Sequence, residues 1–126
     1  MTKEIITTDN VAKHLVPLSS AVKVGNLIFV SGMTPFDSNH QVAKDDFRSQ
    51  MRQCMENMKA VLEAAESSLE KVAKVNVILT RITDFDDMNE IYRTYFKEGN
   101  YPARTTMEAK LNGKDFLLEI ECVAEA

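Results

Sequence analysis

The sequence has 126 residues, of which 44% are hydrophobic and 27% charged, a composition typical of one globular domain that excludes a disordered chain. Fifteen basic against 19 acidic side chains give a formal net charge of -4, which disfavours a nucleic-acid partner. No uncharged stretch is long enough to span a bilayer and the N-terminus does not read as a signal peptide, so we expect a cytoplasmic protein without a membrane partner.

The first third of the chain predicts three strands. Residues 3–8 are rich in β-branched side chains and precede Asp9-Asn10, a pair that ends strands. Residues 22–24 and 27–31 are apolar runs on either side of Gly25-Asn26, which predicts a hairpin.

Two helices and a buried strand are expected next. From residue 45 to 67 apolar side chains recur at steps of three and four with charged side chains opposite, which predicts a long amphipathic helix. Residues 72–81 predict a buried strand. A second amphipathic helix should start after Thr83 as its N-cap and end before Gly99.

The C-terminal part predicts a second hairpin, because residues 104–111 and 114–124 flank Asn112-Gly113, the strongest short hairpin signal. The whole order then favours an α+β fold, a mixed sheet with two helices packed on one face, in one domain over residues 1–126. Two cysteines and two histidines lie far apart in the chain, so we expect no metal site.

A two-residue turn at 112–113 would place Thr106 opposite Glu119 and Arg104 diagonally from Glu119, all on one ionic face. The plainer interpretation is a solvated face with an ordinary Arg104–Glu121 ion pair. However, residues 27–30 are apolar on both faces of their strand, so a second copy of the chain is expected to cover the second face. A guanidinium at the edge of such an interface would bind a carboxylate, which favours a ligand site.

Four segments, in this order and spacing, carry a resemblance to a known family: Val24 to Gly32, Asn89 to Tyr92, Tyr101 to Thr105, and Leu118 to Glu121. Together they resemble the YjgF/RidA family of reactive-intermediate deaminases, over a match that runs from about Ile5 to Ala124.

The resemblance implies a chorismate-mutase-like fold assembled as a homotrimer with clefts between subunits. It also implies hydrolysis of 2-imino and enamine acids to 2-oxo acids with release of ammonia, without a cofactor. By position, Arg104 matches the arginine that holds the substrate carboxylate and Glu119 the glutamate that activates water. Ser31 and Asn89 match two further polar residues of the cleft.

Two positions depart from the family pattern. Thr106 stands where many members have a cysteine, which argues for general acid/base hydrolysis over nucleophilic catalysis. Leu18 stands where many have a tyrosine, which leaves an apolar wall in the substrate site. A larger substrate of the 2-aminomuconate type, from aromatic breakdown, is therefore an alternative to the usual small imines.

A second alternative, from another functional class, is a trimeric protein that binds small carboxylates without turning them over. Members of the family have also been linked to chaperone-like and ribonuclease activities. RNA cleavage fits poorly with a net charge of -4, since phosphate binding depends on clustered basic side chains.

Overall fold

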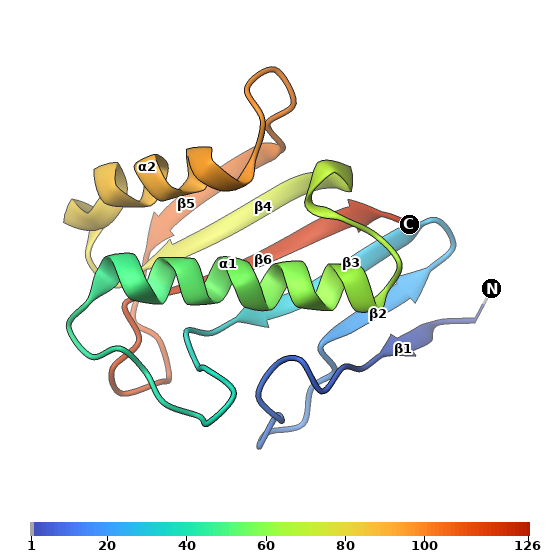
Figure 1. Ribbon diagram of the computed structural model, residues 1–126, viewed down its shortest axis with the longest axis horizontal. Helices are drawn as coiled ribbons and strands as arrows, with labels where there is room; N and C mark the ends of the chain where they lie inside the picture. Colours follow the sequence, from blue (N-terminus) through green and yellow to red (C-terminus); the bar gives the residue numbers. More distant parts are fainter. Residues whose placement is uncertain (1) are drawn as a thin grey trace.

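The computed structural model describes residues 2–126, whose strands form one mixed six-stranded sheet in the order β1-β2-β3-β6-β4-β5 (Figure 1). The predicted order of strands and helices is confirmed. The elements are β1 (Glu4–Ile6), β2 (Ala21–Val24), β3 (Leu27–Met33), α1 (Phe47–Ala64), β4 (Val72–Leu79), α2 (Phe85–Tyr95), β5 (Ala103–Glu108) and β6 (Leu118–Glu125), with short 3-10 turns at Leu69–Lys71 and Ile82–Asp84.

The ends of the helices follow from local hydrogen bonding. At the start of α1 the Asp46 side chain accepts a hydrogen bond from the Ser49 N–H, which satisfies one of the free donors of the first turn. The predicted N-cap at Thr83 is wrong by one residue, because the 3-10 turn Ile82–Asp84 leads into α2 and makes Asp84 the cap. The helix ends at Tyr95, before Gly99, as expected.

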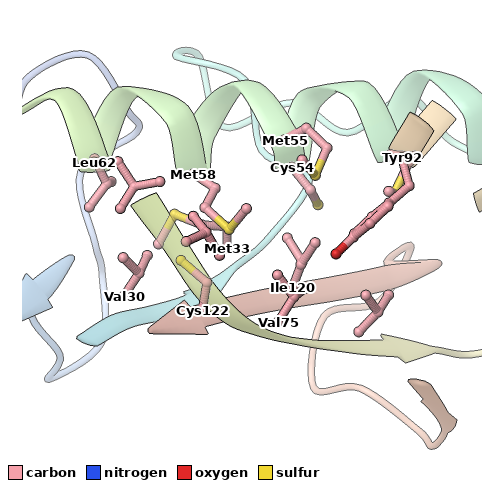
Figure 2. Packing of buried hydrophobic residues seen from close by; sticks show 14 of the residues in the cluster. Val30, Met33, Cys54, Met55, Met58, Leu62, Val75, Tyr92, Ile120 and Cys122 are labelled. Carbon is pink, nitrogen blue, oxygen red and sulfur yellow. The ribbon is translucent and has the colours of Figure 1, made fainter. Parts of the chain in front are cut away.

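Both helices lie on one face of the sheet and bury a sulfur-rich core against it (Figures 1 and 2). The apolar stripe predicted for α1 is confirmed, because its methionines and Cys54 are completely buried. The alternation predicted for β4 is confirmed too, since Val75, Val77 and Leu79 all point into this core. None of the helices among residues 2–126 has the length and apolarity needed to cross a bilayer.

The predicted hairpin of residues 104–124 is wrong. The strand β5 pairs with β4 in parallel, whereas β6 lies between β3 and β4 and is antiparallel to both. The parallel pairing follows from the crossover connection, since α2 carries the chain from the end of β4 back to the start of β5. Residues 109–117 therefore form a loop between two strands that are not neighbours.

The second face of the sheet carries apolar side chains that are exposed to solvent. Leu27 and Phe29 of β3 lie beside Val24 of β2 and Ile5 of β1, and each of the four is more than a third exposed. Such a patch is typical of a surface that another protein chain covers. We call these four residues the open apolar face.

Candidate active site

Arg104 lies at the start of β5 and points toward the helix-covered side of the sheet. Its register partner on β4 is the buried Val75. The guanidinium carbon lies 4.9 Å from the ring centroid of Tyr92 and 5.6 Å from that of Phe85, both on α2. These contacts stabilise the cation through the faces of the rings without neutralising it. No ion pair within residues 2–126 includes Arg104.

A surface cavity of about 380 Å³ opens beside this guanidinium. Asn89 of α2 lines it, so the structure brings together two of the residues that the sequence predicted for the site. The cavity, which we call the arginine recess, thus offers a guanidinium and an amide over aromatic walls, a combination suited to a carboxylate. Its lining consists of Asn89, Tyr92, Arg93, Tyr101, Pro102 and Arg104.

Glu119 lies on the opposite face of the sheet. Its register partner on β4 is Ile78, and it alternates along β6 with the buried Leu118 and Ile120. Arg104 and Glu119 are therefore not on one face, and the register that placed them there is wrong. The reason is that β5 neighbours β4 in parallel, which turns Arg104 and Thr106 toward the helices.

The Glu119 carboxyl group packs directly on the backbone of Gly32 in β3. A Cβ atom added at Gly32 would lie 2.6 Å from the carboxyl carbon and 2.7 Å from Oε2 of Glu119. Burial of the carboxyl group, and secondarily the nearby Glu121 carboxylate, raise the pKa of Glu119 above its usual value. A carboxylate with a raised pKa beside a cavity is a candidate general base.

A second cavity, of about 310 Å³, contains Glu119. Leu18 lines it too, so this cavity brings together two further residues predicted for the site. Its other walls come from the segment 11–16, from residues 32–36 and from the loop before β6. We call it the glutamate pocket.

The two remaining predicted residues have different surroundings. Ser31 donates a hydrogen bond from Oγ to the Ser19 carbonyl (2.5 Å), and its N–H donates to the Ser20 carbonyl, so it fixes the segment that carries Leu18. Thr106 lies next but one to Arg104 on β5, and its Oγ1 is buried without a hydrogen-bond partner within residues 2–126.

Sequence reasoning missed Gln50 and Asn57, two buried amides on the core side of α1. Each binds loop backbone near the glutamate pocket: Gln50 binds Asp115 and Leu117, and Asn57 binds Thr34 and Phe36. The signal available in the sequence was an amide side chain on the apolar stripe of the helix. An amide at such a position is buried, and a buried amide needs hydrogen-bond partners. Within residues 2–126, no three metal-ligating side chains lie together.

Comparison with known proteins agrees with this fold. The family model described as "Endoribonuclease L-PSP" matches residues 8–126. The "RutC family protein PH0854" of Pyrococcus horikoshii is 46% identical over 123 residues, which cover 97% of each chain. A "2-iminobutanoate/2-iminopropanoate deaminase" of Salmonella typhimurium is 33% identical over 121 residues, which cover 94% of each chain. The crystal structure of E. coli TdcF with bound serine is similar with a TM-score of 0.91 at 32% identity, over 98% of each chain. The chain belongs to the YjgF/RidA family.

Proposed function

We propose that the protein is a cofactor-independent deaminase that hydrolyses 2-imino and enamine acids to 2-oxo acids and ammonia. The activity named for the Salmonella relative supports this reaction, and the serine bound to E. coli TdcF supports a site for a small amino-acid-like molecule. We propose further that each site lies between two protomers of a homotrimer, which joins the arginine recess of one chain to the glutamate pocket of the next.

The observation that carries this proposal is the separation of the two groups within one chain. Arg104 and Glu119 point to opposite faces of the same sheet, and each lines its own cavity. A site that uses both therefore needs two chains. The open apolar face gives the chains a reason to associate, because Leu27, Phe29 and their neighbours would leave water.

The chemistry follows from what each half offers. The planar Arg104 guanidinium binds the substrate carboxylate through two parallel hydrogen bonds, and the Asn89 amide stands beside it. Glu119 takes a proton from the water that attacks the imine carbon and gives it to the imine nitrogen, which forms a carbinolamine. The carboxylate then takes the proton of the carbinolamine hydroxyl and gives it to the nitrogen, so that the C=O bond forms while the C–N bond breaks and ammonia leaves. The imine carbon is already electrophilic, so positioning and proton transfer suffice without a nucleophile at Thr106.

Leu18 and Ser31 serve the site indirectly in this proposal. Leu18 supplies apolar wall in the glutamate pocket, and Ser31 holds the segment on which Leu18 lies. Thr106 continues the strand beyond Arg104 and lines the helix side of β5. A cytoplasmic location, and the absence of nucleic-acid and membrane partners, remain predictions.

The test is complementation between two inactive variants. Arg104→Ala retains the glutamate pocket, and Glu119→Gln retains the arginine recess. Each alone should lose on the order of 100-fold or more in kcat/KM. Trimers refolded from an equal mixture should regain about a quarter of wild-type activity, because one cleft in four receives both intact residues. No recovery in mixed trimers would refute the shared site, and the binding of carboxylates without turnover by the wild type would favour the non-catalytic alternative.

A further inference from the structure

We propose that the glutamate pocket is a preformed subsite for the substrate side chain, and that it selects imino acids with unbranched apolar side chains of several carbons over small and acidic ones. This inference rests on the proposed deaminase function and adds the substrate class.

Two aromatic rings line the pocket together with Leu18. Phe36, from the segment after β3, meets Phe116, from the loop before β6, edge to face, with ring centroids 5.1 Å apart and an interplanar angle of 82°. Val16 and Met33 add apolar residues to the lining of the same pocket. A hydrocarbon chain attached to a carbon under attack near Glu119 would leave water on entering this lining.

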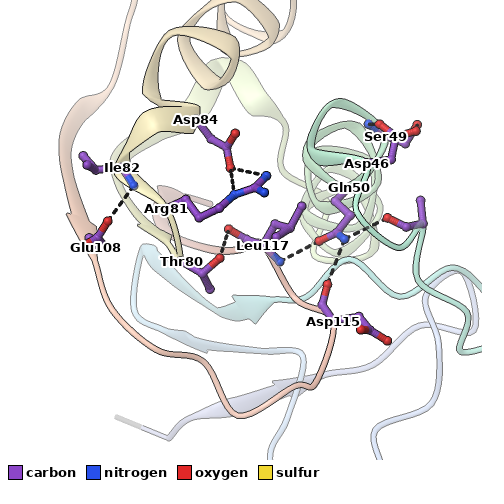
Figure 3. Close-up of polar contacts among 11 residues, drawn as sticks. Asp46, Ser49, Gln50, Thr80, Arg81, Ile82, Asp84, Glu108, Asp115 and Leu117 are labelled. Atoms are coloured by element: carbon purple, nitrogen blue, oxygen red, sulfur yellow. Dashed lines mark hydrogen bonds and ion pairs between the residues drawn. The ribbon is translucent and has the colours of Figure 1, made fainter.

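The two rings are held in place by the two buried amides of α1. The Asn57 Nδ2 donates to the carbonyls of Thr34 (3.0 Å) and Phe36 (2.9 Å), which fixes the segment that carries Phe36. The Gln50 Nε2 donates to the carbonyl of Asp115 (3.0 Å), and its Oε1 accepts from the N–H of Leu117 (2.8 Å) (Figure 3). Phe116 lies between these two anchored residues, so both rings are positioned before a ligand arrives.

Hydrogen bonds within the protein occupy the two histidines that line the pocket. The His40 Nε2 binds the Lys13 carbonyl (2.7 Å) and the His14 Nε2 binds the Ser20 Oγ (2.7 Å), so both rings are committed to the segment that borders the pocket. The Glu119 carboxylate lies inside it and would repel an acidic substrate side chain. Most of the remaining lining residues are apolar or glycine, and the polar exceptions are Lys13, Thr34, Asn57 and Asn112.

The size of the pocket limits the side chain that it accepts. Its volume of about 310 Å³ lies at the lower end of small-molecule sites, which suits a chain of a few carbons but not a large ring system. Each methylene that enters should raise kcat/KM about fourfold, which corresponds to about 0.8 kcal/mol per buried methylene.

The experiment uses a homologous series of imines that an amino-acid oxidase releases in situ from alanine, 2-aminobutanoate, norvaline and norleucine. Glutamate supplies an acidic side chain of similar length. The decay of each imine is measured with and without the protein, in competition with a trapping amine. We expect kcat/KM to rise by on the order of tenfold or more from alanine to norvaline, and the glutamate imine to be the poorest of the longer substrates.

Variants locate the selectivity. Phe36→Ala and Leu18→Asp should reduce the ratio of kcat/KM for the norvaline imine to that for the alanine imine by on the order of tenfold. Ile82→Ala truncates an exposed apolar side chain outside the pocket and should leave the series unchanged. Leu18 is substantially exposed, so Leu18→Asp tests the pocket even where Phe36→Ala impairs folding.

Each outcome bears on a different claim. Equal acceleration of all imines, or a preference for the glutamate imine, overturns the apolar subsite and leaves the deaminase function standing. A gradient that survives both pocket variants also overturns it. No acceleration of any imine overturns the proposed function itself.

Discussion

Gly32→Ala tests whether the contact between Gly32 and Glu119 positions the carboxylate that we propose as the general base. An added Cβ would lie 2.6 Å from the Glu119 carboxyl carbon, whereas ordinary contacts begin near 3.4 Å, so the carboxyl group must retreat by about 0.8 Å. The φ angle of Gly32 lies outside the left-handed region, so the backbone accepts alanine. The added Cβ atom is therefore accommodated mainly by movement of the flexible end of the Glu119 side chain.

The expected result is a loss of activity with little loss of stability. A displacement of this size at the reacting groups reduces kcat/KM by on the order of tenfold to a hundredfold. The midpoint of thermal unfolding should move by less than about 4 °C, because the lower entropy of the unfolded alanine chain offsets part of the strain. Turnover of the norvaline imine and a thermal melt measure the two quantities on the same preparation.

A double-mutant cycle identifies the route of the effect. If the added methyl group acts by displacing the Glu119 carboxylate, then Gly32→Ala should cost little further activity in a Glu119→Gln background. Full activity in the single variant, or the same additional loss in both backgrounds, would show that the contact does not position the base. A large fall in the unfolding midpoint would instead show that the added methyl group destabilises the sheet and does not act on the Glu119 carboxyl group alone.

Three further changes test separate features of the structure. Gln50→Leu should lower the free energy of unfolding by about 2 to 3 kcal/mol in a denaturant titration, because three backbone groups lose their hydrogen bonds to a completely buried side chain, whereas Gln53→Ala on the same helix should lower it by less than about 1 kcal/mol; equal losses would contradict a role of Gln50 in anchoring these loops. Burial is the main cause that raises the pKa of Glu119 and the Glu121 carboxylate adds to it, so Glu121→Gln should lower that pKa. Activity falls as the pH falls through the pKa of a general base, so the acid limb of the kcat/KM profile should then move to lower pH; an unmoved limb would exclude this coupling. Thr106→Val removes a buried hydroxyl without a partner within residues 2–126 and should leave stability unchanged or raise it by up to about 1 kcal/mol, and a fall in turnover would show that the hydroxyl contacts the substrate.

The elements that sequence predicted correctly are those set by local patterns. The helical stripe of α1 and the alternation of β4 depend on residues a few positions apart, and both are buried as expected. The β2–β3 hairpin around Gly25 is also confirmed, because residue 25 adopts the positive φ of 60° that this turn requires. In each case neighbouring residues carry enough information to specify the structure.

The prediction of a C-terminal hairpin was wrong because it relied on a local turn signal and ignored the pairing of β6 with strands distant in the sequence. The pair Asn112-Gly113 favours a tight turn, but Ile120 and Cys122 of β6 bury more completely between β3 and β4 than they would at an edge. The parallel position beside β4 then remains for β5. This one exchange of neighbours reversed the predicted face of Arg104 and Thr106.

The separation of Arg104 from Glu119 preserves what each group needs for the proposed reaction. In the register first predicted, Arg104 would lie opposite Glu121 and diagonally from Glu119, so that a carboxylate of its own chain would occupy the guanidinium and the nearby cation would lower the pKa of Glu119. In the observed fold, the guanidinium rests on the rings of Tyr92 and Phe85, which leave its charge intact. Burial and the neighbouring Glu121 keep the pKa of Glu119 raised. In the proposed site between two chains, the Arg104 guanidinium is therefore free to bind the carboxylate of the substrate. The Glu119 carboxyl group is likewise free to act on the water that attacks the electrophilic carbon.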